Sequence, residues 1–514
     1  MLPLHDARAV RAMEAVSTRD VDGDEDALMH RAGLACWRAL LRRWPAAQRI
    51  AIACGPGNNG GDGYVLALHA LLAGRDVTVV RLAAHAPSTA SARRACAAFD
   101  AAGGGFEDFD DDGTSEGAAM TRDTASPRTA LHRAELLVDA VFGLGLSRAP
   151  DAATTALLRA LARAGTPVMA IDVPSGVDAD TGDVPGDALT AVLTLQLLAR
   201  HVGLHSGAAL GYVGELAFDG LDDAAPPAVS QPPAAWLLRP PALAAVLPSR
   251  GRNSHKGDGG HVLCIGGDHG HGGAVLLAAD AALRCGAGLI TVATRTAHVG
   301  SLLARRPEAM AWGIDDLHGD EALARLLGAA SVVAIGTGLG QGSWGRALFA
   351  AALGASRPLV IDADALQLLA RDPALLPADA VLTPHPGEAG RLLGLTAADV
   401  QRDRRASARQ LAERHGCVVV LKGAGTIIAA PGRTPRVVGA GNPGMAVGGM
   451  GDLLTGTIAA MRAQGLDAFD AACHGALLHA AAGDAAAADG GERGLLPSDL
   501  LPWLRRGANP GARP

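Results

Sequence analysis

The chain has 514 residues and a formal net charge of −7, from 45 basic and 52 acidic side chains, and 49% of its residues are hydrophobic. This length supports two cores of roughly 200 residues each, and the lack of a basic block argues against nucleic acid as the main partner. The seven cysteines form no Cys-x-x-Cys pair, which argues against a disulfide framework or a thiolate zinc site.

Neither a secretory signal nor a membrane helix is indicated by the sequence. Charged residues interrupt the first sixteen positions, and no uncharged apolar run has the length and flanks of a membrane span. We therefore expect a cytoplasmic protein that acts on small molecules, without a nucleic-acid or membrane partner.

Short β-branched runs alternate with Ala- and Leu-rich stretches along the chain, a pattern typical of parallel βαβ units. The predicted strands of the first half are 49–55, 77–82, 136–143 and 168–176. Those of the second half are 261–267, 289–294, 331–338, 359–364, 380–385 and 417–423. We expect an α/β protein with two three-layer αβα domains. Because open α/β sheets bind ligands beyond the carboxyl ends of their strands, each half should carry one site.

Two irregular stretches divide this pattern. The segment 223–248 is rich in proline, which sustains neither a helix nor a central strand, and it is the predicted linker between domains at 1–222 and 249–506. A short tail, 507–514, follows. The stretch 103–127 is acidic, with Asp110, Asp111 and Asp112 adjacent, and predicts a solvated surface insertion rather than a cation site.

A glycine-rich loop follows the first predicted strand of the first half. The sequence PGNNGGDG precedes a helix that is expected from about Tyr64. Glycines let backbone N–H groups approach a ligand, and a helix N-terminus adds partial positive charge, so the loop suits a nucleotide phosphate. A purely structural turn would also account for the glycines. The polar side chains beside them are Asn58, Asn59 and Asp62.

Two aspartates end later strands of the same half. Asp139 closes the run LLVD, and Asp172 closes VMAID. In a parallel sheet both should emerge at the edge that holds the Asn-Gly loop. Such carboxylates could bind a hard cation, serve as a general acid or base, or simply cap the next turn.

In this order, N-N-G-G-D-G, V-D-A-x-F-G-x-G-L-x-R and D-x-P-S-G resemble the NAD(P)HX epimerase domain, over roughly residues 10 to 220. The resemblance implies a Rossmann-like fold, a potassium ion held by Asn59, Asp139 and Ser175, and Asp172 as the acid/base that interconverts R and S hydrates at C6. Leu144 departs from the family, which often has Thr there. The residues implied at the hydrated nucleotide are Asn58, Asn59, Gly60, Gly61, Asp62, Gly143, Leu144, Gly145, Leu146, Ser147, Arg148, Ala149 and Asp172.

The only two lysines of the chain, Lys256 and Lys422, both precede glycine in glycine-rich turns of the second half. A compact ammonium beside exposed backbone N–H groups suits a phosphate, so both lysines are candidate anion-binding residues. Chance retention of two lysines in an Arg-rich chain is the alternative.

The strongest single motif of the second half is GNPGMAVGGMGDLLTG, in which a run of glycines precedes Asp452 and a helix. Glycines at a helix N-terminus build an anion hole, and an aspartate on the first turn would be repelled by phosphate unless it is paired, meets cation-bridged phosphate or acts as a base. The arrangement fits phosphoryl transfer to a hydroxyl. A helix cap is the plain alternative for Asp452.

Together, H-K-G-D-x-G-H, T-P-H-P-G-E, K-G-A-G-T and G-G-M-G-D-L-L-T-G resemble the ADP-dependent NAD(P)HX dehydratase domain, over roughly residues 240 to 505. The resemblance implies a ribokinase-like fold. His385 could otherwise be a packed core histidine. The implied adenine-nucleotide contacts are Lys422, Gly423, Ala424, Gly425, Thr426 and Gly451. The implied hydrate contacts are Ala274, Gly338, His385 and Asp452.

The two resemblances imply a bifunctional repair enzyme for hydrated nicotinamide nucleotides, NADHX and NADPHX. We also expect a homo-oligomer. Asp452 would take the hydroxyl proton, and Lys422 and the glycine loop would stabilise a phosphoryl group transferred from ADP with the help of Mg²⁺, giving AMP and phosphate. The alternative is a ribokinase-type small-molecule kinase with an N-terminal nucleotide-binding regulatory domain.

Overall fold

The computed structural model describes residues 1–20, 25–109, 129–146, 148–221, 231–246, 250–316 and 321–509. The chain divides into two units, one of Pro3–Ala234 and one of Ala235–Pro514 with Met1–Leu2. From residue 110 onward the predicted insertion lies outside the described residues, together with linker residues 223–230 and tail residues 510–514. None of the described helices has the length and apolar character needed to cross a membrane.

The first unit is built on a seven-stranded, fully parallel sheet in the order β4-β3-β2-β5-β6-β7-β8. Four of these strands, β2, β3, β5 and β6, match the predicted ones. The others were missed because they are short or lack a β-branched run. The bounds are β2 (Arg49–Cys54), β3 (Asp76–Arg81), β4 (Gly105–Asp108), β5 (Leu136–Ala140), β6 (Val168–Ile171), β7 (Leu193–Leu197) and β8 (Glu215–Asp219).

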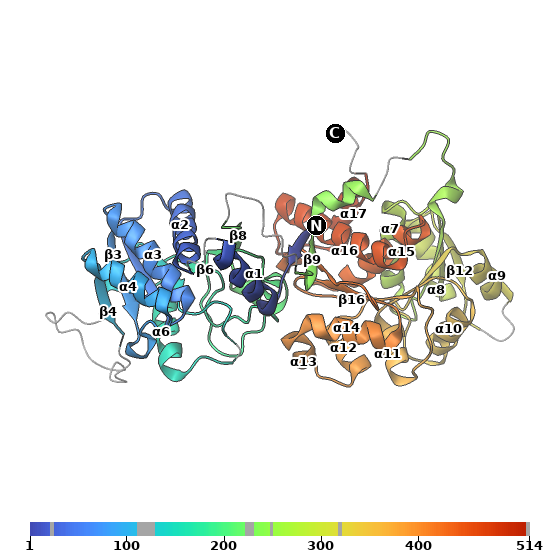
Figure 1. Ribbon diagram of the computed structural model, residues 1–514. Coiled ribbons are helices and arrows are strands. Elements are labelled where there is room, and N and C mark those ends of the chain that lie inside the picture. The colour runs from blue at the N-terminus through green and yellow to red at the C-terminus, as the bar shows by residue number, and fades with distance from the viewer. Residues whose placement is uncertain are drawn as a thin grey trace, which may run out of the picture. The chain divides into compact units, whose positions relative to one another are not determined.

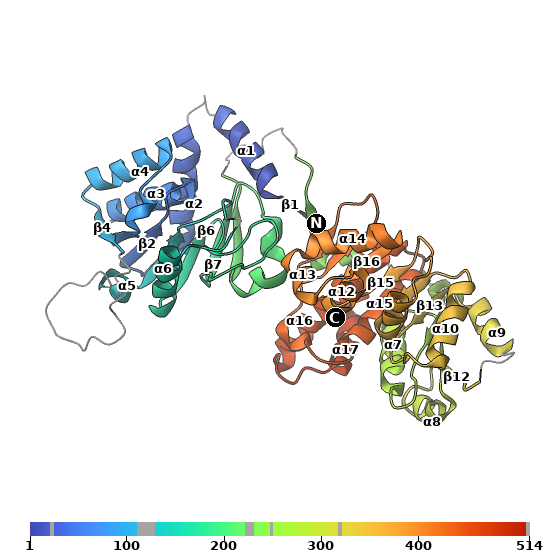
Figure 2. The same ribbon diagram turned by 90° about the horizontal axis from the view of Figure 1, so that it is seen from below.

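Helices cover both faces of this sheet and bury a separate apolar cluster on each. One cluster packs α2, α3 and α4 against the sheet, and the other packs α5 and α6 against the opposite face (Figure 1, Figure 2). The unit is therefore three-layered, as expected. A short strand, β1 (Leu2–Leu4), precedes the helices, whose bounds are α1 (Ala7–Asp20), α2 (Glu25–Arg43), α3 (Asn58–Leu72), α4 (Ala90–Ala101), α5 (Thr129–Arg133) and α6 (Ala152–Arg163).

Helix α3 begins at Asn58, six residues before the predicted start at Tyr64, so that prediction was wrong. The glycines of the segment are helical because the helix lies almost on the backbone beneath it. A Cβ on Gly60 would come within 2.0 Å of the carbonyl oxygen of Gly55, and one on Gly63 within 2.9 Å of Cys54 Sγ. The Asn-Gly motif therefore forms the first turn of a helix rather than a loop.

The second unit has a sheet whose order from β9 onward is β9-β18-β17-β16-β15-β14-β13-β10-β11-β12. Its pairs are parallel except β16–β17 and β17–β18. The six predicted strands correspond to β10, β11, β13, β14, β15 and β16. The bounds are β9 (Ala235–Leu238), β10 (His261–Ile265), β11 (Leu289–Thr294), β12 (Met310–Gly313), β13 (Val332–Ile335), β14 (Leu359–Ile361), β15 (Val381–Leu382), β16 (Val418–Leu421), β17 (Ile427–Ala429) and β18 (Arg436–Val438).

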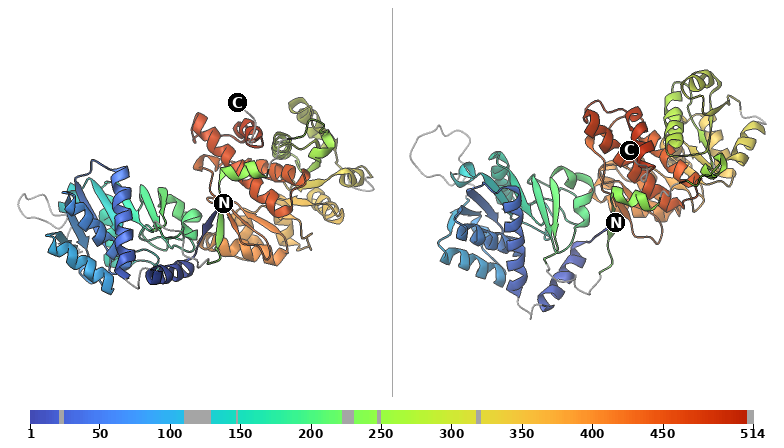
Figure 3. Two further views of the ribbon diagram at one scale, coloured as in Figure 1. Left: turned by 45° about the horizontal axis from the view of Figure 1, so that its top comes forward. Right: turned by 90° about the horizontal axis from the view of Figure 1, so that it is seen from above.

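One large apolar cluster joins α7, α15, α16 and α17 to this sheet, and α11, α12 and α14 cover the other face (Figure 1). Figure 3 shows the two long C-terminal helices α15 and α16, in red, side by side. The bounds are α7 (Gly272–Arg284), α8 (Thr296–Arg305), α9 (Glu321–Ala329), α10 (Ser343–Gly354), α11 (Ala363–Arg371), α12 (Pro386–Leu393), α13 (Ala397–Arg402), α14 (Arg404–His415), α15 (Met450–Ala463), α16 (Ala468–Gly490) and α17 (Pro497–Gly507).

Part of the segment expected to be a linker is ordered in the second unit. Residues Ala235–Leu238 form β9, which pairs with β18 in parallel, and Pro240–Ala245 form a short 3₁₀ helix. A proline-rich stretch can enter a sheet where its prolines flank the strand, as they do here.

Candidate active sites

The carboxyl edge of the first sheet gathers the polar residues predicted there. Asp139 lies near the end of β5, Asp172 directly follows β6, and the first turn of α3 follows β2. Because β2, β5 and β6 are neighbours and run parallel, these three segments emerge side by side.

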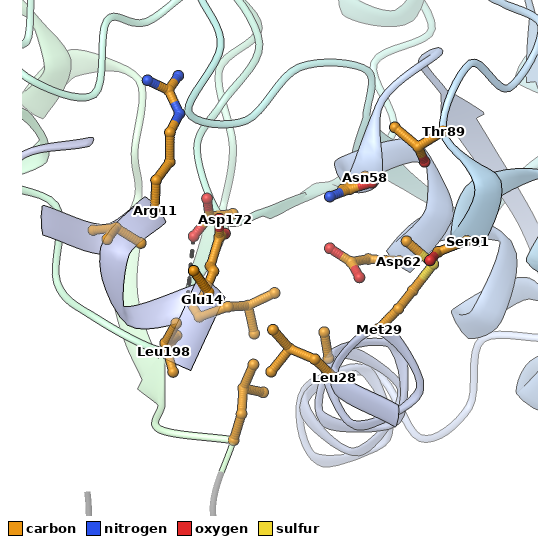
Figure 4. A pocket seen from close by; sticks show the side chains of 15 residues that line it. Arg11, Glu14, Leu28, Met29, Asn58, Asp62, Thr89, Ser91, Asp172 and Leu198 are labelled. Atoms are coloured by element: carbon orange, nitrogen blue, oxygen red, sulfur yellow. Dashed lines mark hydrogen bonds between the residues drawn. The ribbon is translucent and has the colours of Figure 1, made fainter. Parts of the chain in front are cut away.

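A cavity of about 390 Å³ opens at this edge. Glu14 and Asp172 lie on one side of it, Asn58 and Asp62 lie on the other, and Leu28 contributes to its apolar floor (Figure 4). The full lining is Val10, Arg11, Glu14, Ala15, Leu28, Met29, Ala32, Asn58, Asp62, Thr89, Ser91, Asp172, Leu197, Leu198 and Leu221.

Two of the carboxyl groups that line the cavity, those of Glu14 and Asp62, have raised pKa values. Burial, together with the nearby charge of Asp172, raises the pKa of Glu14 to about 7. Burial also raises the pKa of Asp62, with further contributions from Asp172 and Glu14. A group such as Glu14, whose pKa lies near neutral pH, can both give and take a proton, which is the requirement for acid/base exchange.

Asp139 and Ser175 form a buried pair beneath the edge. The backbone N–H of Ser175 donates to Oδ2 of Asp139 at 2.7 Å and its hydroxyl donates to Oδ1 at 2.6 Å. Both side chains are fully buried, and no Lys, Arg or His of the described chain forms an ion pair with Asp139. Asn59 lies nearby, because a Cβ on Gly143 would be 3.3 Å from its Cγ. The Asn59 amide nitrogen is buried without a hydrogen-bond partner in the described structure.

The loop after β5 contacts the site only in part. Arg11 of α1 donates from Nη2 to the carbonyl oxygen of Leu144 at 3.0 Å, and Gly143 abuts Asn59. Ser147 lies outside the described residues, and Arg148 is exposed. The remaining predicted loop residues, Gly145, Leu146 and Ala149, do not line the cavity.

In the second unit, Lys422 directly follows β16 and reaches a buried carboxylate. Its Nζ lies 2.6 Å from Oδ1 of Asp362, which directly follows β14, and 3.8 Å from Oε2 of Glu388. Thr455 of α15 donates to the other oxygen of Asp362 at 2.8 Å. Although burial alone lowers the pKa of Lys422, Asp362 and Glu388 raise it above its ordinary value, so the ammonium stays charged.

The glycine run leads into the first turn of α15 beside this ion pair. Gly449 has φ +95° at the N-cap, and a Cβ on Gly451 would lie 3.3 Å from Lys422 Nζ. Burial and the nearby charge of Asp362 together raise the pKa of Asp452 to about 7, although Lys422 opposes the increase. The helix N-terminus, the lysine and a carboxylate that titrates near neutral pH thus meet at one point.

The turn from Lys422 to Thr426 is held from below by a buried arginine. Arg404 donates from Nη2 to the carbonyl oxygens of Leu421 and Lys422, both at 3.2 Å. Gly423 has φ +134°, and a Cβ there would lie 3.0 Å from Arg404. The Thr426 hydroxyl donates to the Gly423 carbonyl at 3.0 Å, which closes the turn. Ala424 and Gly425 lie at its tip.

His385 caps helix α12 at the same edge. Its Nδ1 accepts from the backbone N–H of Gly387 at 3.0 Å, and its backbone N–H donates to Glu388 Oε2 at 2.8 Å. The His385 ring is half exposed, which differs from the packed core histidine that the sequence left open. Burial and the nearby Lys422 lower its pKa. A neutral imidazole is therefore presented beside Lys422.

Two further predicted residues, Gly338 and Ala274, lie together in the structure, whereas Lys256 lies away from Lys422. A Cβ on Gly338 would lie 3.2 Å from Cβ of Ala274, at the edge formed by the ends of β13 and β10. Lys256 precedes β10, whereas Lys422 follows β16, a strand that runs parallel to β10 in the same sheet. The two lysines therefore lie at opposite edges, and only Lys422 is at the site.

Several site residues were missed from the sequence. Asp362 directly follows the apolar run LVI, just as Asp139 and Asp172 follow apolar runs. The sequence pattern that identified Asp139 and Asp172 was therefore present at Asp362 as well. Glu14 and His201 follow no such run. Glu14 lies near Asp172 because α1 packs there, and His201 contacts Asp172 from the turn after β7.

Two family models match the chain: "YjeF-related protein N-terminus" over residues 25–203 and "NAD(P)H-hydrate dehydratase" over residues 262–506. The bifunctional NAD(P)H-hydrate repair enzyme Nnr of Coxiella burnetii is 43% identical, covering 99% of this chain and 100% of that protein. The corresponding protein of Escherichia coli is 40% identical, covering 94% and 89%. A solved ribokinase-like superfamily protein from Enterococcus faecalis is 32% identical with a TM-score of 0.51, covering 55% of this chain and 98% of that one.

Proposed function

The chain belongs to the family of bifunctional NAD(P)H-hydrate repair enzymes, and on that premise we propose that residues 1–222 interconvert the R and S hydrates of NADH and NADPH while residues 249–506 dehydrate the S form. The observation that carries the proposal is the pair of separate carboxylates, Asp172 and Asp452. Each lies at the carboxyl edge of the parallel strands of its own sheet, beside a glycine-rich helix N-terminus.

In the first unit, Asp172 is the acid/base. A hydroxyl on the carbon next to a ring nitrogen leaves as water once it is protonated, and water that adds to the opposite face of the resulting iminium gives the other epimer. The proton that Asp172 supplies to the leaving hydroxyl returns to it from the incoming water, so the exchange is balanced. The cavity beside Asp172 supports this role, and Asn58 and the backbone of α3 would orient the nucleotide.

Asp139, Ser175 and Asn59 are suited to a potassium ion. Their oxygens are hard donors, and a buried carboxylate without a cationic side chain partner is costly unless an ion compensates it. The unpartnered Asn59 amide next to this pair fits the same interpretation, because rotating the amide would turn its oxygen toward the ion. The ion would supply positive charge near the nucleotide.

In the second unit, Asp452 takes the proton of the substrate hydroxyl, and the oxygen attacks the terminal phosphoryl group of ADP with AMP leaving. Phosphate is then eliminated together with a proton from the neighbouring ring carbon, which restores the double bond of NADH or NADPH. Lys422 and the N–H groups at the start of α15 face the transferring charge. A base whose pKa is about 7 suits this step at neutral pH.

Magnesium would be bound chiefly through the nucleotide. Among the described residues, no group of three or more His, Cys, Asp and Glu side chains is arranged to hold a metal. Mg²⁺ commonly keeps several waters and binds to substrate phosphates with one or two carboxylates, and Asp452 and Asp364 are acidic groups at this edge.

The test is recovery of NADH absorbance from an R,S mixture of NADHX, with ADP or ATP and with or without K⁺. Complete recovery is expected with ADP, because the first unit converts R-NADHX to S-NADHX as the second unit consumes S-NADHX. Recovery of only the S fraction would remove the epimerase assignment. Accumulation of a phosphorylated alcohol from ATP without any NADH would favour the ribokinase-type kinase instead.

A further inference from the structure

Asp172 is held in a backbone conformation that most side chains avoid. Its φ is +65°, in the left-handed region, and its backbone N–H donates to the carbonyl oxygen of Leu195 at 2.8 Å. A non-glycine residue there costs of order 1–3 kcal/mol and persists only where the surroundings enforce it. The conformation places the carboxyl group at the cavity wall.

One oxygen of this carboxyl group, Oδ1, is held by two contacts within the protein. Oδ1 lies 2.5 Å from Nε2 of His201 and accepts from the backbone N–H of Leu197 at 3.2 Å. No hydrogen bond to Oδ2 is found in the described part of the chain. Asp172 therefore presents one anchored oxygen and one oxygen that is available to a ligand in the cavity.

His201 is placed to hold that anchor. Its side chain is completely buried, and its backbone N–H donates to Oε1 of Gln196 at 2.9 Å. With Oδ1 of Asp172 as the acceptor of this contact, the ring proton is on Nε2. Nδ1 then keeps a lone pair that meets no partner in the described structure.

The charged groups around this pair lie on two sides. On the cavity side Asp172 faces Glu14 and Asp62, and Arg11 lies near Glu14. On the buried side His201 faces His5 and His205, whose pKa values are both lowered, first by burial. Among the described residues, the His201 side chain thus has one hydrogen-bonding contact, and that contact is Asp172.

The geometry points to His201 as a positioning residue for epimerisation: its Nε2–H fixes Asp172 so that Oδ2 faces the hydrate. This inference rests on the proposed epimerase function. It adds a residue that does not touch the substrate and acts only through Asp172. A histidine that merely fills space would be replaceable by an apolar side chain of similar volume, whereas a hydrogen-bond donor would not.

The experiment compares His201→Leu with His201→Gln in the full chain. Gln offers an N–H at similar reach without a titratable ring, and Leu matches the volume alone. We expect the kcat of R-to-S exchange to fall about 100-fold in His201→Leu and to stay within about fivefold of wild type in His201→Gln, with KM nearly unchanged in both. His205→Gln changes another buried histidine of the same turn and should leave exchange intact.

Dehydration of S-NADHX by the same polypeptide measures the amount of active chain in every variant. Equal exchange by His201→Leu and wild type overturns the inference, and so does a Gln variant no better than Leu. If both variants lose epimer exchange and the amides of β6 and β7 also exchange hydrogen faster, His201 has a structural role. That result also overturns the inference. If wild type itself fails to exchange the epimers, the proposed function fails instead.

Discussion

Lys422 Nζ lies 2.6 Å from Oδ1 of Asp362, and the other oxygen of Asp362 accepts a hydrogen bond from Thr455. This contact joins the turn after β16 to the end of β14 and to α15, which are three of the segments that form the candidate dehydratase site. The lysine charge is thereby compensated before any phosphate arrives.

Removing one member of this pair should destabilise the second unit. Asp362 is almost completely buried and the Lys422 side chain is 18% exposed, so Asp362→Ala leaves an ammonium without its nearest counter-charge. We expect a cost of about 3–5 kcal/mol, and the double variant Asp362→Leu/Lys422→Met should recover much of it. The measurement is the opening free energy of β14 and β16 amides by hydrogen exchange. A single variant that loses less than about 1 kcal/mol would contradict the assignment.

The pH dependence of dehydration should follow Asp452. The pKa of this group is raised to about 7 by burial and by Asp362, and a base works only when ionised. The rate kcat/KM should therefore fall about tenfold per pH unit below about pH 7 and level off above it. Asp362→Asn removes a charge that raises the pKa of Asp452, so the midpoint should move to lower pH. A midpoint that moves to higher pH would show that another group controls the profile.

Asp452→Asn should abolish dehydration without affecting epimerisation. The amide keeps the shape of the carboxyl group but cannot take the hydroxyl proton, and loss of a general base typically costs about 10²–10⁴-fold. NADH recovery from S-NADHX measures the effect, and R/S exchange on the same chain is the internal control. A helix cap would behave differently, because Asn caps as well as Asp does and activity would persist.

Sequence patterns predicted the site where a local signal existed. Asp139, Asp172 and Lys422 each end an apolar run, and the parallel-sheet rule then places them at a common edge. Asp362 carries the same signal, but it falls inside the predicted strand 359–364 and was not singled out. Glu14 and His201 could not be predicted, because nothing local shows that α1 and the turn after β7 pack against Asp172. The start of α3 was misplaced because glycines weaken a helix by propensity, and close packing against Gly55 overrides that preference here.

Potassium should stabilise the first unit through Asp139. An ion that binds the folded state adds a stabilisation of about 2.7 kcal/mol at a concentration of 100 times its Kd. The unfolding midpoint of the first unit should therefore rise with K⁺, and Asp139→Asn should abolish the dependence by removing the buried negative charge. Choline chloride at equal ionic strength is the control. An identical rise in choline would assign the effect to ionic strength.

Two glycines at the start of α3 should lose different amounts of stability on the same substitution. A Cβ on Gly60 would lie 2.0 Å from the Gly55 carbonyl oxygen, a backbone atom that cannot move aside, so Gly60→Ala must displace the helix. Gly57 has φ −91°, and a Cβ there would have no neighbouring atom within 4 Å, so Gly57→Ala meets open space. We expect a loss of about 1–3 kcal/mol for Gly60→Ala and less than about 1 kcal/mol for Gly57→Ala, measured by hydrogen exchange of α3 amides.

The Gly57→Ala and Gly60→Ala variants also show whether these glycines are needed for helix packing or for contact with the nucleotide. Displacing α3 moves Asn58 and Asp62, which line the cavity opposite Asp172, so epimer exchange should fall in Gly60→Ala while dehydration by the second unit persists. Gly57→Ala leaves these side chains in place and should keep exchange. If both variants lost exchange with α3 intact, the glycines would be needed for close approach of the nucleotide to the backbone rather than for helix packing.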